Sequence, residues 1–144
     1  MNNFTIFISF KDSLQIYPNN QAHTFIVQLP KSLNLCSETW QCAVNSILVH
    51  KSEGAADTPT LIKTDLCEES ICYGSYSSVL AEFLLKKAAG WQRELYTFPR
   101  YISLRKDSVR FITVSIQTLK ENERLALLDV RLQLSFEKIK KVKL

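Results

Sequence analysis

The sequence predicts an all-β protein with one helix, built as an antiparallel β-sandwich of about eight strands. Three observations carry this prediction. Residues 128–137 alternate apolar and polar side chains at every position, which is typical of a strand with one buried face. Short apolar, β-branched runs recur along the chain between turn residues. Only residues 75–91 carry apolar side chains at helical spacing.

The strand signal recurs from one end of the chain to the other. It is carried by residues 4–10, 14–17, 24–29, 40–49, 60–66, 100–104, 109–116 and 128–137. The runs at 4–10, 40–49 and 109–116 are apolar on nearly every residue and are expected to be buried on both faces. Trp40 opens one of them, so we expect its large ring in the core.

The last strand has one expected core face and one expected outer face, because side chains alternate across a strand. The apolar residues expected in the core are Val130, Leu132, Leu134 and Phe136. The polar residues expected to face water or a partner are Arg131, Gln133 and Ser135.

A turn is predicted before the short apolar run at residues 24–29. Its residues are Tyr17, Pro18, Asn19 and Asn20, where proline fixes φ and asparagine tolerates left-handed geometry. The run that follows is expected to end at Pro30, because proline cannot donate to a sheet ladder. The turn and Pro30 would therefore delimit one strand of the sandwich.

A single amphipathic helix is predicted near residues 76–89. Its apolar residues stand at helical offsets and are Val79, Leu80, Phe83, Leu84 and Ala88. Glu82 and Lys86 form an i, i+4 pair, and Gly90 stands where a helix-ending glycine belongs. Ser75 or Ser77 would cap the start of this helix.

Length and composition indicate one globular domain, at residues 1–137, followed by a basic tail at residues 138–144. The chain has 144 residues, of which 46% are hydrophobic and 22% charged. No apolar run approaches the roughly 18 residues that a membrane-spanning helix needs. The first ten residues lack a basic region and a cleavage site, so we expect no secretion and four reduced cysteines: Cys36, Cys42, Cys67 and Cys72.

The sequence does not predict an enzyme, and we expect no catalytic residue, cofactor or metal. Only three glycines are present, so no phosphate-binding loop can be built. No nucleophile motif surrounds the cysteines, and their spacing does not match a zinc site.

The tail is the most distinctive charged feature. It carries Lys138, Lys140, Lys141 and Lys143, and these lysines would contact a neighbouring subunit or the phosphates of a nucleic acid. The alternative is a strand end whose lysines guard an exposed sheet edge. No aromatic residue stands between the lysines to stack on bases, which favours the second interpretation.

Several segments in this order resemble virion proteins of Polinton (Maverick) elements and the related adintoviruses. They are FISFKDSLQIYPNN at 7–20, FIVQLPKSLNL at 25–35, WQCAVNSI at 40–47 and YGSYSSVLAEFL at 73–84. The final alternating strand is similar to the ending of those proteins. Together these segments cover roughly two thirds of the chain.

The resemblance implies a non-enzymatic capsid subunit, either a penton or a minor capsid protein, with a single jelly roll of eight strands in two sheets. Its partners would be its own copies, five in a ring if it is a penton, and other capsid proteins. It would be assembled in the nucleus or cytoplasm and would end in the virion. A spike base or a host-domesticated copy is also compatible with the same segments.

The alternative from another class is a small intracellular module. It would be a monomeric β-sandwich that binds a protein or a nucleic acid through its basic tail, and descent from such an element is compatible with this hypothesis. Size separates the two hypotheses, because a capsid subunit forms closed assemblies and the module stays monomeric.

Overall fold

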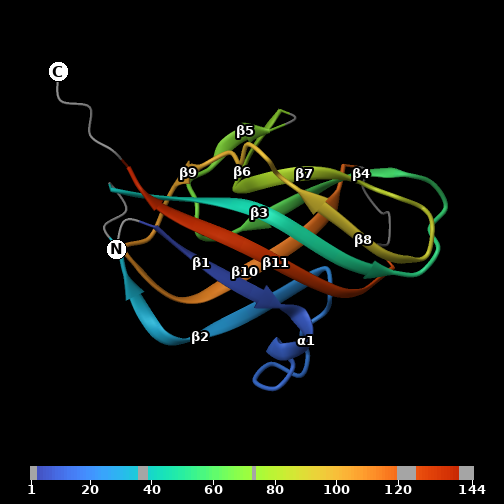
Figure 1. The fold of residues 1–144 in the computed structure, drawn as a ribbon, viewed down its shortest axis with the longest axis horizontal. Coiled ribbons are helices and arrows are strands. Elements are labelled where there is room, and N and C mark those ends of the chain that lie inside the picture. The colour runs from blue at the N-terminus through green and yellow to red at the C-terminus, as the bar shows by residue number, and fades with distance from the viewer. Residues whose placement is uncertain (1–2, 36–38, 73, 120–125, 140–144) are drawn as a thin grey trace.

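Two antiparallel sheets lie face to face in the computed structural model, which describes residues 3–35, 39–72, 74–119 and 126–139 (Figure 1). Sheet A has the order β1-β11-β3-β8, and sheet B has the order β2-β10-β4-β7. Sheet A consists of β1 (Asn3–Ser9), β11 (Leu127–Lys138), β3 (Trp40–Lys51) and β8 (Gly90–Leu95). Sheet B consists of β2 (Thr24–Asn34), β10 (Ser108–Thr118), β4 (Thr58–Thr64) and β7 (Val79–Leu85).

Three short strands complete the described structure. β9 (Ile102–Ser103) pairs with β3, and β5 (Ser70–Cys72) pairs with β6 (Ser75–Ser77). The eight longer strands, lettered B to I in chain order, place B, I, D and G in sheet A and C, H, E and F in sheet B. This strand order is that of a single jelly roll, so the predicted fold class is confirmed.

The core fills the space between the two sheets. The expected inward side chains of β11 are buried, with Val130 and Phe136 fully so. Trp40 is also buried, and its ring centroid lies 5.4 Å from that of Phe4. Sheet B contributes Phe25, Ile62, Ile112, Val114 and Ile116 to the same cluster. Each such side chain contributes about 1.5–3 kcal/mol when it leaves water.

Two of the three strands predicted to be buried on both faces, β1 and β10, have one buried face instead, whereas β3 is buried on both faces from Cys42 to Val44. In β10, Val109 and Ile112 are buried, whereas Phe111 is 48% exposed. In β1, Ile8 is buried and Phe7 is 77% exposed. Because no layer formed by the described residues covers the outer face of either sheet at these positions, continuous apolar sequence leaves large side chains in solvent.

The helix predicted near residues 76–89 is absent, and the segment forms β6, β7 and the start of β8. β7 pairs with β4, so its backbone groups are bonded between strands. Phe83 and Leu85 are buried, while Glu82 and Leu84 are exposed, which is the alternation of a strand. Gly90 has φ of 115° where β8 begins, so its left-handed geometry serves a strand connection.

The described helix lies elsewhere, at α1 (Phe10–Ser13), between the strands predicted at residues 4–10 and 14–17. Ser9 ends β1 and caps α1, because its Oγ accepts a hydrogen bond from the Asp12 N–H at 3.4 Å. The strand predicted at residues 14–17 is therefore wrong, since turns follow α1 directly.

The turn before β2 closes through a hydrogen bond from the Asn20 N–H to the Tyr17 carbonyl, at 3.1 Å. The side chain of Asn20 then donates to the Ile26 carbonyl at 2.9 Å and accepts from the Ile26 N–H at 3.3 Å. The Asn20 side chain thus pairs with both backbone groups of Ile26, as the backbone of a neighbouring strand would, and joins the turn to β2. Pro18 and Asn19 occupy the middle of this turn.

Pro30 does not end its strand, contrary to the prediction. β2 continues to Asn34, and its pairing with β10 is irregular between Val109 and Phe111. The missing N–H of proline costs little at such a bulge. The Pro30 carbonyl accepts a hydrogen bond from Arg110 Nη1 at 2.9 Å, which keeps this part of β2 against β10.

Candidate functional site: the outer face of sheet A

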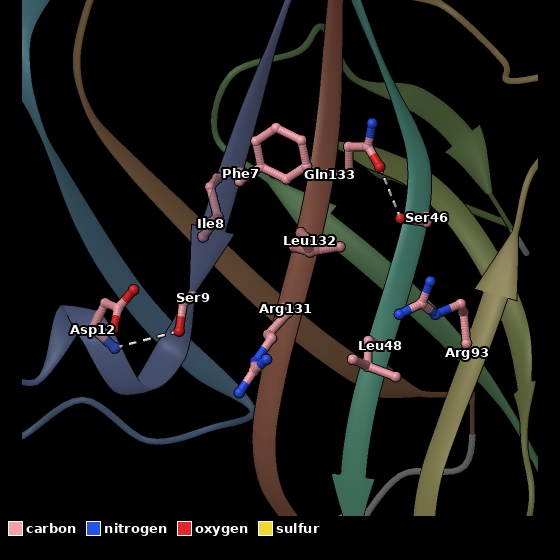
Figure 2. Close-up of a pocket in the computed structure, with 10 residues that line it drawn as sticks. All are labelled: Phe7, Ile8, Ser9, Asp12, Ser46, Leu48, Arg93, Arg131, Leu132 and Gln133. Atoms are coloured by element: carbon pink, nitrogen blue, oxygen red, sulfur yellow. Dashed lines mark hydrogen bonds between the residues drawn. The ribbon is translucent and has the colours of Figure 1, made fainter.

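The register of sheet A places outward side chains in rows across its four strands. One row joins Ser9, Arg131, Leu48 and Arg93, from β1 to β8. The next row joins Phe7, Gln133, Ser46 and Leu95. Figure 2 shows most of these side chains on one face, with Arg131 between β1 and β3 and Arg93 on β8.

These rows border a shallow groove of about 310 Å³. The exposed ring of Phe7 and the side chain of Leu48 give it apolar surface on the outer face, whereas Ile8 and Leu132, which also line it, are buried in the core. Asp12 lines one end, close to β1, and Arg93 lines the other end, on β8 (Figure 2). Apolar side chains with polar groups at the rim are typical of a surface that binds a protein segment.

Arg131 is held in place from two sides. Its Nε lies 3.2 Å from Oδ2 of Asp129, a carboxylate that is fully buried and that also accepts the Val130 N–H at 2.9 Å. Its guanidinium carbon lies 5.3 Å from the centroid of the Trp91 ring, within cation–π distance. His50 stacks on the same ring at 4.5 Å. The guanidinium is therefore preorganised, with little side-chain entropy left to lose on binding.

Two charged groups of the groove have no ion pair within the described residues. The carboxylate of Asp12 and the guanidinium of Arg93 are both exposed, and neither makes a side-chain hydrogen bond there. They stand at opposite edges of sheet A, with Arg131 between them at about the same level (Figure 2). The groove is consequently polarised, acidic at the β1 end and basic at the β8 end.

Ser135 does not face water, in contrast to Arg131 and Gln133. It is 9% exposed because other side chains cover it on the outer face. Asn45 donates a hydrogen bond to its Oγ, and Tyr101 contacts it from the segment that follows β8. Desolvation and the neighbouring carboxylate of Glu137 raise the pKa of Tyr101.

Tyr96, which follows β8, joins this strand to β7 of the other sheet. Its hydroxyl donates to the Glu82 carbonyl at 2.9 Å, which links the edge of sheet A to the edge of sheet B. Burial, and secondarily the carboxylates of Glu94 and Glu82, raise its pKa to about 12. The phenol therefore stays protonated and keeps donating at any ordinary pH.

Cys42 and Cys67 are free, fully buried thiols. The Cys67 thiol lies 3.9 Å from the Ile102 carbonyl, and a hydrogen bond with Cys67, together with burial, raises the pKa of Cys42. A thiol with a raised pKa is a poor nucleophile, which excludes Cys42 as one, and both cysteines are part of the buried core cluster. Cys36 and the side chain of Cys72 lie outside the described part of the structure.

The tail residues fall mostly outside the described residues. Lys138 is exposed and ends β11 opposite Trp40, whereas Lys140, Lys141 and Lys143 are not described. Up to Lys138, β11 pairs with β1 on one side and with β3 on the other, so the described part of this strand offers no free edge for lysines to guard. The part of that interpretation that concerns Lys140, Lys141 and Lys143 lies outside the described residues. The free edges of sheet A belong to β1 and β8.

Sequence reasoning missed most of the groove. Arg131 and Gln133 were found by alternation, but Phe7 stands in a run predicted to be buried on both faces. Arg93 and Trp91 follow a segment with the apolar spacing of a helix, so no strand was expected there. In the structure Trp91, Arg93 and Leu95 are exposed and alternate with less exposed neighbours, but the sequence GWQREL does not alternate apolar and polar residues, so it carries no strand signal.

Neither a cluster of metal ligands nor a membrane-spanning helix is found among the described residues. Among the described residues, no group of three or more histidine, cysteine, aspartate or glutamate side chains is arranged to hold a metal ion. No helix in the same part of the chain has the length and apolar character required to cross a membrane.

The chain is similar in structure to the mavirus penton protein, known from a crystal structure of its selenomethionine form. The two superpose with a TM-score of 0.64, and the match covers 95% of this chain and 100% of the penton chain. Sequence identity is 8%. No protein-family model and no curated protein sequence matches the chain. The chain therefore has a penton-like jelly-roll fold, as the sequence resemblance implies.

Proposed function

We propose that this chain is a non-enzymatic capsid subunit of the penton type, which acts by assembling with its own copies and with other shell proteins. One observation carries the proposal: the structural match to a penton protein runs through nearly the whole of both chains. The sequence segments shared with Polinton and adintovirus virion proteins point the same way. The site of action would be the virion, after assembly in the nucleus or cytoplasm.

The surface of the molecule supports a role in protein assembly. The groove on the outer face of sheet A has exposed Phe7 and Leu95 beside it. Aromatic residues and arginines are enriched at protein interfaces, and both kinds gather here. A shell subunit requires such surfaces and no catalytic group.

Electron microscopy of the purified full chain, in negative stain, tests the proposal. We expect rings of identical subunits, fivefold if the protein is a penton, because identical chains with a head-to-tail contact close into rings. Particles of monomer size at every protein concentration would contradict the proposal and favour the binding module.

The basic tail has its own part in the proposal. Lys138, Lys140, Lys141 and Lys143 would bind acidic groups of neighbouring shell proteins or of the packaged nucleic acid. A chain that ends at Ile139 should fold normally, since β11 ends at Lys138. It should lose the salt-sensitive part of the binding, measured with a co-encoded shell protein and with a DNA duplex at several salt concentrations. Unchanged binding to both would remove the tail from the proposal.

A further inference from the structure

The two edges of sheet A are complementary to each other, and this relationship carries the inference. Within the described residues, β1 pairs with β11 alone and β8 pairs with β3 alone, so each has one side without a strand partner. β1 reads NFTIFIS and contains no charge, proline or glycine. Edge strands of stable monomers are normally guarded by such residues. β1 therefore has the composition of a strand edge that is covered in the working assembly.

Large apolar side chains stand at both ends of one row of the sheet. Phe7, on β1, is 77% exposed, and Leu95, on β8, is 69% exposed. They share the row that runs through Gln133 and Ser46. Both edges therefore offer apolar surface at the same level of the sheet.

The adjoining row ends in opposite charges. Arg93 ends it on β8, and Asp12 lies at its β1 end, where its N–H bonds to Ser9. Both charges lack a partner within the described chain, as shown above. On both edges, the apolar residue lies in one row and the charged residue lies at the adjoining row, on the same side of it. Placing a second sheet beside the first, with its β1 next to β8, therefore brings Phe7 to Leu95 and Asp12 to Arg93.

We propose that a second copy of this chain binds head to tail, with the β1 edge of one copy against the β8 edge of the next. Phe7 then contacts Leu95 of the neighbouring copy, and Asp12 forms an ion pair with Arg93 of that copy. The two edge strands run antiparallel, as all neighbours in sheet A do. Such a heterologous contact closes into a ring when each copy is also rotated about a common axis relative to the one before it, and this rotation is part of the proposed arrangement.

This arrangement rests on the proposed function and specifies its contact surface. A face-to-face dimer is the competing arrangement of two copies, and it would use the groove without using both edges in turn. Only the head-to-tail contact gives assemblies larger than two from one kind of interface.

Charge exchange tests the proposed ion pair. Asp12→Arg and Arg93→Asp each place like charges in contact, so each should raise the protein concentration needed for half-assembly by about tenfold. The double variant restores opposite charges in exchanged positions and should return close to the wild-type value. Assembly is measured by sedimentation velocity over a range of protein concentrations, and far-ultraviolet circular dichroism checks that each variant is folded.

Two further variants complete the design. Phe7→Ser removes the apolar contact without touching the core, since Phe7 is mostly exposed, and should also weaken assembly. Glu68→Lys reverses an exposed charge outside sheet A and serves as the matched control, with wild-type assembly expected.

The outcomes separate this contact from the proposed function. If the wild type forms rings and the charge variants form them equally well, the edge contact is wrong while the capsid proposal stands. Failure of the double variant to recover, or a wild type that stops at a dimer, also overturns the head-to-tail contact. A wild type that remains monomeric overturns both.

Discussion

The buried carboxylate of Asp129 holds the exposed guanidinium of Arg131, with 3.2 Å between Oδ2 and Nε. Asp129 itself is fully buried, while the Arg131 side chain is 56% exposed. A buried charge needs a partner, because its transfer from water is costly otherwise. This contact therefore fixes the first residues of β11 and the direction in which Arg131 faces the groove.

Removing the arginine should expose that dependence. We expect Arg131→Ala to lower the free energy of unfolding by about 1–3 kcal/mol, because Asp129 is then left with the Val130 N–H as its main donor. Arg93→Ala, which removes an unpaired guanidinium from the same row, should change it by less than about 0.5 kcal/mol. Urea unfolding of the monomeric form measures both, and equal effects would mean that the Asp129–Arg131 contact does not stabilise the fold.

The two faces of β11 should respond differently to the same substitution. Leu132→Asp places a carboxylate at a position that is 3% exposed in the core and should abolish soluble folding. Gln133→Asp changes the next residue, which contacts Ser46 on the outer face, and should be tolerated. The soluble fraction after expression is the measurement, and similar solubility of the two variants would contradict the assigned strand faces.

Neighbouring residues of β7 distinguish strand from helix in the segment where the two differ most. Phe83→Ala removes a buried ring and should cost about 3–5 kcal/mol of stability, as large core truncations do. Leu84 is 41% exposed, so Leu84→Ala should cost well under half of that. A helix with the apolar spacing of this segment would bury both side chains, and comparable losses in thermal unfolding would support it.

Tyr96 should make stability depend on pH in the alkaline range. Its folded pKa is about 12, above the value near 10 of an unfolded tyrosine. The protonated form is favoured by folding, so this stabilisation is complete below about pH 10 and declines as the pH rises toward 12. The decline should be smaller in Tyr96→Phe. A spectrophotometric titration should also lose its late-titrating component in that variant, and an unchanged titration curve would contradict the assignment.

The sequence predicts the sandwich well because its strongest signal is local. In β11, alternation persists over most of the strand, and the apolar positions from Val130 to Phe136 are all buried, whereas Leu128 at the start of the strand is 49% exposed. The jelly-roll strand order is not local, and it came from the resemblance to virion proteins. The register and the neighbours of each strand depend on the topology of distant segments, which periodicity does not contain.

The wrong helix has a specific physical cause. Val79 and Leu80 are both buried although they are adjacent, because the β4–β7 pairing is irregular between the Lys63–Val79 and Ile62–Ala81 pairs and leaves Leu80 as the extra residue. Such a bulge sets two successive residues against one and turns both side chains inward. Adjacent buried residues followed by Phe83 then match helical spacing, and the alternation that begins at Ala81 is too short to outweigh it.

The groove was the least predictable feature. Asp12 and Arg93 acquire their relationship only because β1 and β8 occupy opposite edges of one sheet. Nothing in the sequence near either residue marks it as unpaired. Phe7 gave a misleading signal, since an apolar residue in an apolar run normally indicates burial.

Native mass spectrometry of the full-length protein, at low and high protein concentration, tests the central claim most directly. The chain has a mass of 16.6 kDa, and the account predicts one dominant closed assembly at an integer multiple above two, five for a penton. The Arg93→Asp variant should shift that population toward monomer, and the exchange with Asp12→Arg should restore it. A wild-type chain that remains at 16.6 kDa under all of these conditions would contradict the claim that this jelly roll is a capsid subunit.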